Sequence, residues 1–169
     1  MSCEHAHQKG IPPYGYIGLS DLKKHLPEIY DRLLVKCEWQ KEHELAFLKK
    51  EGTDELPEVI KNLLVMRKLD GEKYKKLVAS IQLQLGQKEV VTSSSRVKPW
   101  KSNNAGSNKI YEFKSSAGLG FRLFFFFHNG DIIICTHGWV KNNEKDTKQQ
   151  DQQFRRAETM RILLEGKNE

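Results

Sequence analysis

The sequence predicts an α+β fold in which N-terminal helices and a C-terminal helix pack on a small, twisted antiparallel sheet. Apolar residues recur at helical spacing through most of residues 22–85. Residues 121–139 are instead aromatic and β-branched, with an Asn-Gly pair near their centre. Helical spacing returns in residues 147–164. We therefore expect helices first, then a sheet, and finally one helix that closes the chain.

The composition is that of a globular domain with a single core. The chain has 169 residues, of which 38% are hydrophobic and 30% are charged. Every apolar run is shorter than the roughly 20 residues that a transmembrane helix needs, and the first residues lack the pattern of a secretory signal. Three widely spaced cysteines indicate reduced thiols rather than disulfides. These features favour a cytoplasmic protein that makes no contact with a membrane.

The first 18 residues predict a loose arm, because they contain three glycines and two consecutive prolines and lack a sustained periodicity. Cys3, His5 and His7 are of the types that bind zinc. Three alternating residues at the end of a chain make a poor site, however, and a solvated tail is the better interpretation. We therefore expect no bound metal.

A long helix is predicted from Leu22 to about Lys50, where apolar residues recur at roughly helical spacing. Ser20 would be its N-cap, and Pro27 would mark the first position of its main segment. We assign residues 1–52 to the arm and this extra helix. Residues 53–169 form the second unit, and we expect both to make one compact body.

Two shorter helices are predicted between residues 57 and 85. Pro57 begins the first helix, and Gly71 separates it from the second, which runs to Leu85. The apolar residues of each helix fall on one face, and they are Val59, Ile60, Leu63, Leu64 and Met66, followed by Tyr74, Leu77, Val78, Ile81 and Leu85. The short connection predicts an antiparallel pair whose apolar face covers a sheet.

The sequence then changes to a strand-forming type. Residues 88–92 are compatible with a short strand, and residues 97–101 should be extended because a residue before proline avoids the α region. A strand is predicted at 110–114. Longer strands follow at 121–128 and 131–139, joined by Asn129-Gly130, which tolerates the positive φ of a type I′ turn.

The last part of the chain completes the predicted core. Cys135 lies in an apolar strand, so we expect it to be buried, and Trp139 is expected to be a core residue too. The closing helix is predicted over residues 147–164, with Gly166 as its end signal.

Positive charge is concentrated in the second half of the chain. Residues 1–95 hold 15 Lys and Arg against 14 Asp and Glu, whereas residues 96–169 hold 13 against 8. This excess indicates a nucleic acid or an acidic protein as the partner of that half. Basic side chains also interrupt the apolar strands and continue after them; they are Lys114, Arg122 and His137, then Lys141, Lys145 and Lys148. Cations on a rigid sheet suit a polyanion.

Three runs in this region carry a family resemblance. They are Tyr111-Glu112-Phe113-Lys114, Phe121-Arg122-Leu123-Phe124-Phe125 and His137-Gly138-Trp139-Val140-Lys141. With the order of helical pair, sheet, basic loop and closing helix, they resemble the RelE/HigB-like toxins of type II toxin–antitoxin systems, particularly the phage-derived branch. The resemblance covers residues 111–165 and extends back to about Glu55. It does not cover the segment before that.

The resemblance implies a RelE-like fold and a small endoribonuclease that needs no metal or other cofactor and cuts messenger RNA at the ribosome. It also implies a cognate antitoxin, expected to be a helix-turn-helix protein. In such a reaction the 2′-hydroxyl attacks the adjacent phosphate and a base takes its proton. Cations stabilise the phosphorane charge, and an acid protonates the leaving 5′-oxygen. Lys, Arg, His or Tyr side chains suffice for these tasks.

The resemblance also assigns catalytic roles. Arg122 matches the arginine that holds the scissile phosphate, although it could instead pair with Glu112. Lys114 would bind phosphate or act as the base, or be a solvated strand end. His137 would be a general acid or base, or a structural histidine hydrogen-bonded to backbone. Lys141 matches the first lysine of a pair and would grip the RNA backbone.

A second group of residues would bind RNA outside the reacting phosphate. Lys145 and Lys148 match the trailing lysines of the family, with a solvated loop as the alternative. Trp100, between Lys98 and Lys101, could stack on a base, which contributes ~1–3 kcal/mol. Alternatively, Trp100 packs over the edge of the sheet and both lysines are solvated.

The sequence departs from the family at two positions and leaves three classes of function open. Asn142 replaces the second lysine of the pair and Thr147 replaces a proline, which puts the efficiency of cleavage in doubt. The first class is the ribonuclease toxin. The second is a ParE-like toxin of the same fold that inhibits DNA gyrase. The third is a non-catalytic module that binds RNA or a protein through the positive face.

Overall fold

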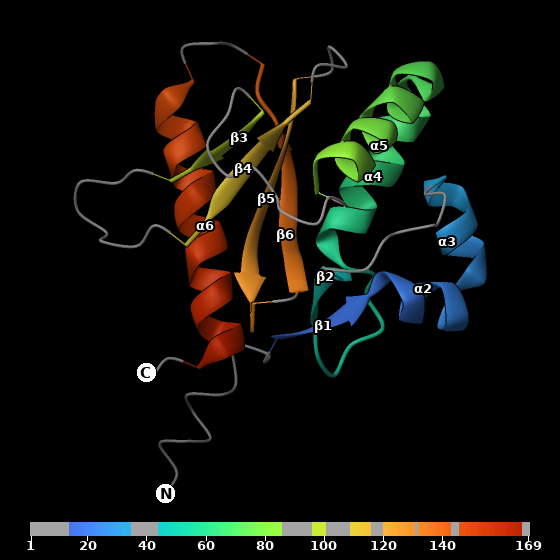
Figure 1. Ribbon diagram of the computed structural model, residues 1–169, viewed down its shortest axis with the longest axis horizontal. Helices are drawn as coiled ribbons and strands as arrows, with labels where there is room; N and C mark the ends of the chain where they lie inside the picture. Colours follow the sequence, from blue (N-terminus) through green and yellow to red (C-terminus); the bar gives the residue numbers. More distant parts are fainter. Residues whose placement is uncertain are drawn as a thin grey trace, which may run out of the picture.

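The hairpin predicted around Asn129-Gly130 forms the centre of the structure, which is a computed structural model (Figure 1). Strand β5 (Phe121–His128) pairs antiparallel with β6 (Ile132–Val140). The φ angles of Asn129 and Gly130 are 55° and 82°, as a type I′ turn requires at both central positions. The prediction of the hairpin is therefore confirmed.

All strands of the described residues belong to one sheet. The structure describes residues 14–34, 44–85, 96–100, 109–115, 120–130, 132–142 and 146–166. Within these ranges six strands lie in the order β1-β2-β6-β5-β4-β3, accompanied by five helices. Strands β4 (Tyr111–Lys114) and β3 (Val97–Pro99) continue the antiparallel pairing beyond β5. The predicted α+β class is confirmed, as is the extended segment before Trp100.

The N-terminal segment is part of the sheet, and the long helix predicted over residues 22–50 is wrong. Strand β1 (Tyr14–Gly18) pairs antiparallel with β2 (Glu44–Lys50), and β2 pairs in parallel with β6. The sheet is consequently mixed, not purely antiparallel. Residues 45–48 are buried, and a short apolar run of this kind suits a strand covered on both faces as well as it suits a helix.

Only the first part of that segment is helical. Helix α2 (Leu19–His25) is followed by α3 (Pro27–Leu33), which begins with the proline as predicted. Helix α2 follows Gly18, so Ser20 is not its N-cap. The loose arm predicted for residues 1–18 is wrong for residues 14–18, which form β1. The strand predicted at 88–92 and the residues Cys3, His5 and His7 lie outside the described part of the chain.

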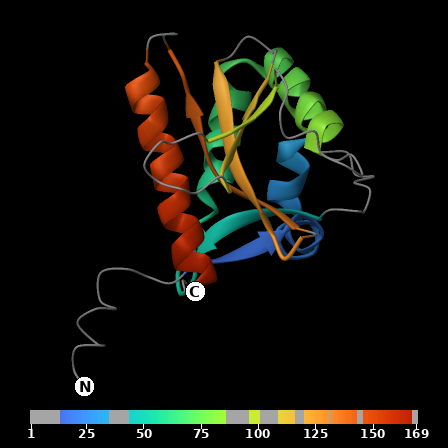
Figure 2. The same ribbon diagram turned by 60° about the vertical axis from the view of Figure 1, so that its left-hand side comes forward.

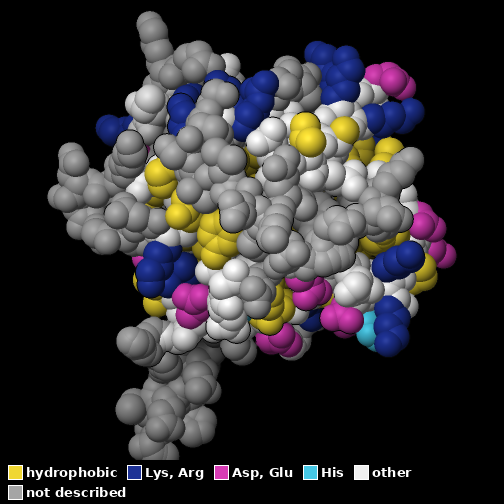
Figure 3. Space-filling view, in the orientation of Figure 1, with side chains coloured by type: hydrophobic (Ala, Val, Ile, Leu, Met, Phe, Trp, Pro, Cys, Tyr) yellow, Lys and Arg dark blue, Asp and Glu magenta, His cyan; other side chains and the backbone are white. Residues whose placement is uncertain are grey.

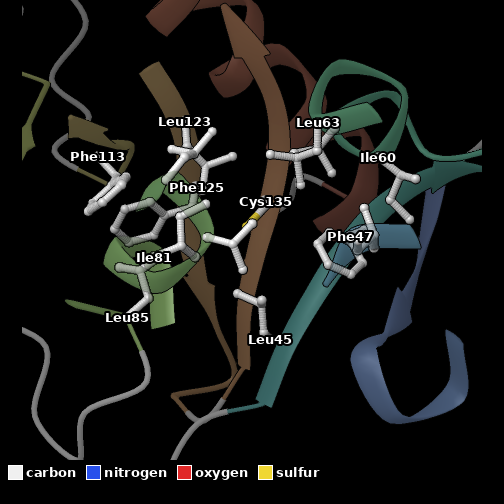
Figure 4. Packing of buried hydrophobic residues seen from close by; sticks show 14 of the residues in the cluster. Leu45, Phe47, Ile60, Leu63, Ile81, Leu85, Phe113, Leu123, Phe125 and Cys135 are labelled. Carbon is white, nitrogen blue, oxygen red and sulfur yellow. The ribbon is translucent and has the colours of Figure 1, made fainter. Parts of the chain in front are cut away.

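Helices α2 to α5 cover one face of the sheet (Figure 1). The predicted helical pair is confirmed as α4 (Glu58–Leu69) and α5 (Gly71–Leu85). Figure 4 shows apolar side chains of these two helices meeting those of β2, β5 and β6, including the buried Cys135. The hydroxyl of Tyr74 donates a hydrogen bond of 2.7 Å to the carbonyl oxygen of Leu33, which ties α5 to α3.

Helix α6 (Thr147–Glu165) covers the opposite face and confirms the predicted closing helix (Figure 2). Its buried residues Phe154, Ala157 and Met160 pack in a second core cluster that includes Phe124 of β5. Trp139 is half-buried at the border of that cluster. Gly166 has a φ of 79° at the end of α6, as expected for a left-handed C-terminal residue. No described helix has both the length and the apolar character to cross a membrane.

Deletion of residues 1–52 is expected to yield an aggregated or unfolded fragment. The deletion removes β2, so the edge of β6 loses its hydrogen-bonding partner and the buried residues 133–135 lose part of their cover. Size-exclusion chromatography and thermal melting by circular dichroism measure the effect. Deletion of residues 1–13 alone retains β1 and β2 and is the control. A monomeric 53–169 fragment with a cooperative melt would show that both strands are dispensable.

Candidate functional site

Polar residues of β3, β4 and β5 share the face of the sheet that α6 covers. The register places Lys98 opposite Glu112, and it places Lys114 opposite Arg122. Residues directly opposite each other in paired strands point to the same side, and successive residues alternate. Phe113 points into the core beneath α4 and α5. The four polar residues therefore point toward α6.

Arg122 is buried in this face and forms an ion pair with Glu112. Its side chain is 5% exposed, and its Nε lies 3.5 Å from Oε2 of Glu112. Within the described residues this Nε has no hydrogen-bond partner. A buried donor without a partner is costly and therefore rare, and bound ligands are one reason for such a group. The ion pair that the sequence left open is present, but the Nε–H of Arg122 makes no hydrogen bond to any described residue.

Glu112 is the centre of a network that reaches across to β6. The amide nitrogen Nε2 of Gln150, in the first turns of α6, donates a hydrogen bond to Oε2 of Glu112. The ammonium of Lys141 donates to Oε1 of Gln150 at 2.8 Å. Burial raises the pKa of the Glu112 carboxyl, while the Gln150 hydrogen bond and the charges of Arg122, Lys141 and Lys98 lower it in part. Three cations thus surround one buried carboxyl.

Lys141 is placed by the backbone at the end of β6. Its amide N–H donates a hydrogen bond of 2.8 Å to the carbonyl oxygen of Gly120. Gly120 has a φ of 70°, and a Cβ at this position would lie 2.7 Å from the carbonyl oxygen of Lys141. Only glycine permits this approach without strain. The start of β5 and the end of β6 are therefore held together beside Arg122.

Lys114 lies next to Arg122 at the end of β4. It is half-buried, and its amide N–H donates a hydrogen bond of 2.7 Å to the carbonyl oxygen of Arg96. Figure 3 shows several Lys and Arg side chains along the upper part of the molecule, where Figure 1 places the end of β4, the start of α6 and, to the right, α4 and α5. Part of this basic surface thus adjoins the buried network.

His137 lies deeper in the same face and has no exposed surface. Its ring stacks on Phe124, its Nδ1 lies 3.0 Å from the hydroxyl oxygen of Thr136, and its Nε2 lies 2.9 Å from Oε1 of Gln153. Burial and the charge of Arg156 lower the pKa of His137 to about 4, although the Gln153 hydrogen bond and the charge of Glu58 act in the opposite direction. A neutral, enclosed imidazole suits a structural role.

Trp100 packs against α6, as the alternative interpretation expected. Its ring stacks on Phe154 with the two planes 8° apart, and its Nε1 donates a hydrogen bond of 2.8 Å to Oδ1 of Asp151. Only 4% of the residue is exposed. The guanidinium carbon of Arg155 also lies 5.8 Å from the centre of this ring. A base could stack on Trp100 only after the side chains that cover it had moved, so this arrangement does not favour base stacking.

A cleft of about 220 Å³ lies between β3 and the first turns of α6. It is lined by Lys98, Pro99, Trp100, Glu112, Thr147, Gln150, Asp151 and Phe154. Lys98 and Lys148 are exposed, whereas Lys101 and Lys145 lie outside the described residues. The cleft gives the buried carboxyl of Glu112 a route to solvent beside an exposed lysine.

The sequence analysis did not identify Gln150 as a site residue and recognised Glu112 only in part. Glu112 was considered only as a counter-ion, although it lies in the quoted strand motif. Gln150 belongs to a glutamine-rich stretch with no pattern that distinguishes it from Gln149, so only the contact with Glu112, 38 positions away, identifies it. Among the described residues, no group of three or more His, Cys, Asp and Glu is arranged to hold a metal ion.

Comparison with known proteins finds one family. A family model described as phage derived protein Gp49-like (DUF891) matches residues 64–161. The match runs from the second half of α4 into α6 and includes β3 to β6, whereas α2, α3, β1 and β2 lie outside it. No curated protein matches the chain.

Acidification is expected to destabilise the protein through His137. The pKa of this group falls from 6.5 to about 4 on folding, so between these values the unfolded chain binds a proton that the folded chain does not. The contribution of neutral His137 to the free energy of unfolding is complete above pH 6.5. It decreases by up to about 1.4 kcal/mol per pH unit as the pH falls toward 4. Urea unfolding at pH 7.5 and pH 5 measures it. The difference between the free energies of unfolding at the two pH values should be smaller in His137→Gln than in wild type. Substitution of the exposed His25 by Gln is the control and should leave that difference unchanged.

Proposed function

Because the chain belongs to the Gp49-like family, a family of RelE/HigB-like toxins, we propose that it is a type II toxin that cleaves messenger RNA at the ribosome. The observation that carries the proposal is Arg122, a buried arginine beside Lys114 and Glu112 whose Nε–H has no hydrogen-bond partner among the residues that the structure describes. A guanidinium held by a rigid sheet is preorganised for the charge that develops on a phosphate. The exposed Lys98 and Lys148 would contact the backbone on either side.

The proposed reaction uses the 2′-hydroxyl of the RNA as the nucleophile. The bond from O2′ to phosphorus forms and the bond from phosphorus to O5′ breaks. The leaving O5′ takes a proton from water, so the products are a 2′,3′-cyclic phosphate and a 5′-hydroxyl. Arg122 stabilises the phosphorane charge, Lys114 binds a non-bridging oxygen, and Lys141 binds the adjoining backbone. The site needs no metal or other cofactor for these steps, because the cations that it requires are side chains.

We assign the uptake of the 2′-hydroxyl proton to Glu112. Glu112 lines the cleft, and burial raises the pKa of its carboxyl, which makes the carboxylate a stronger base. The hydrogen bond from Gln150 and the charges of Arg122, Lys141 and Lys98 favour the ionised form of this carboxyl. Lys114 is the other candidate base. His137 is enclosed and fully hydrogen-bonded, so we assign it to the stability of the sheet rather than to proton transfer.

A cognate antitoxin is part of the proposal, since the family is toxin-like and such toxins are neutralised by a partner. We expect a small helix-turn-helix protein, encoded beside this chain. Its acidic segments would complement the basic surface that adjoins Arg122.

Substitution of Arg122 is expected to abolish RNA cleavage. Arg122→Lys keeps the charge but loses the planar guanidinium, and we expect cleavage to fall by at least about 100-fold because such donors act mainly in the transition state. Arg122→Ala removes the counter-charge of a buried carboxylate as well, so the conservative variant is the primary test. Cleavage is measured on a messenger in a cell-free translation reaction. Lys68→Ala, an exposed lysine of α4, is the control.

The alternative of a ParE-like gyrase inhibitor predicts a different order of events in the cell. Pulse labelling after induction of the toxin should show that protein synthesis stops before DNA synthesis if the chain cleaves messenger RNA. The reverse order would contradict the ribonuclease and favour a gyrase poison. A non-catalytic RNA-binding module would bind RNA and leave it intact, and Arg122→Lys would then change affinity only.

A further inference from the structure

Gln150 joins two groups of opposite charge that do not touch each other. Its amide nitrogen faces the carboxyl of Glu112, and its amide oxygen faces the ammonium of Lys141. The reverse orientation would put the NH₂ group against an ammonium and the oxygen against a carboxylate, so the charges fix the orientation of the amide. The side chain of Gln150 is therefore a neutral bridge with matched ends.

The bridge is anchored by α6. Gln150 lies in the first turns of this helix, and the next turn packs through Phe154 against the rings of Trp100 and Phe124. The backbone of Lys141 is held by the hydrogen bond that its amide N–H donates to the carbonyl oxygen of Gly120. The backbones of Gln150 and Lys141 are thus both fixed by regular structure. The flexible part is the lysine side chain, whose four-carbon stem can bring its ammonium to several positions.

A lysine this close to a buried carboxylate would be expected to pair with it directly. The charge of Lys141 is near enough to lower the pKa of Glu112, although burial of Glu112 has the larger, opposite effect. A direct ion pair would occupy the carboxylate and neutralise the ammonium. Within the described part of the chain the ammonium uses one of its three donors, on an uncharged amide, and the other two are available for a ligand.

We propose that Gln150 is a positioning residue, a spacer that keeps the ammonium of Lys141 apart from the carboxylate of Glu112 and so keeps it available for an RNA phosphate. This inference rests on the proposed function, since RNA is the ligand whose phosphate Lys141 would hold. Gln150 itself acts through its two neighbours. Loss of the amide would let Lys141 pair directly with Glu112, which takes away a phosphate contact without altering the number of charges.

The test compares RNA binding by wild type, Gln150→Ala, and the double variant Gln150→Ala with Glu112→Gln. For single-stranded RNA the slope of log K against log salt concentration changes by roughly 0.7 for each phosphate that a protein neutralises. We expect Gln150→Ala to reduce the slope by about this amount. Glu112→Gln removes the competing carboxylate, so the double variant should regain the wild-type slope, a rescue that a merely structural defect would not show.

Gln149→Ala is the matched control, because Gln149 is the preceding residue of the same helix and is exposed. It should keep the wild-type slope. A wild-type slope in Gln150→Ala, or a double variant that stays at the reduced slope, overturns the inference. Cleavage by the wild-type chain is measured in parallel. If the chain binds RNA without cutting it, the proposed ribonuclease activity is wrong, but the salt slopes still test the role of Gln150 as a spacer.

A second measurement does not need RNA. The coupling between Glu112→Gln and Lys141→Met in the free energy of unfolding reports how strongly the two side chains interact. We expect this coupling to be larger in the Gln150→Ala background than in the wild-type background, because the direct pair then forms. Equal couplings in the two backgrounds overturn the inference even if the wild-type chain binds no RNA.

Discussion

The pairing of β5 with β6 is the constraint on which the rest of the structure depends. The two strands lie at the centre of the sheet, and their side chains belong to both core clusters, one beneath α2 to α5 and one beneath α6. The pairing also brings Arg122 at the start of β5 near Lys141, which follows β6. A change in register by one residue would exchange the two faces and move Arg122 away from α6. The cationic site and the core are therefore specified by the same hydrogen bonds.

The face beneath α6 combines burial with charge, and the helix supplies hydrogen-bond partners for several polar groups there, although Nε of Arg122 has none among the described residues. Gln150 bridges Glu112 and Lys141, Gln153 contacts His137, and Asp151 accepts the indole N–H of Trp100. A buried polar group without such a partner would cost on the order of 1–3 kcal/mol. The side of α6 that contacts the sheet consequently carries both apolar residues and polar side chains, and each of these polar side chains binds a particular group of the sheet.

The segment outside the family match changes the edge of the sheet. The matched region includes β3 to β6, in which β6 would be an outer strand, whereas here β2 pairs with it and β1 extends the sheet further. A long apolar strand with an open edge is prone to pair with other chains. Strands β1 and β2 therefore protect the most apolar strand pair of the molecule, and α2 and α3 add to the core cluster beneath α4 and α5.

The sequence by itself determined the elements whose signals are local. Asn129-Gly130 specified the turn, and the helical spacing after Pro57 and after Thr147 specified α4, α5 and α6, because turn dihedrals and helix periodicity depend on neighbouring residues. Only the tertiary structure decided that residues 44–50 form a strand, since a short run buried on both faces has no periodicity of its own. It also decided the network of Glu112, Gln150 and Lys141. Glu112 lies 38 positions before Gln150, and a hydrogen bond between α6 and the sheet exists only after the helix has packed.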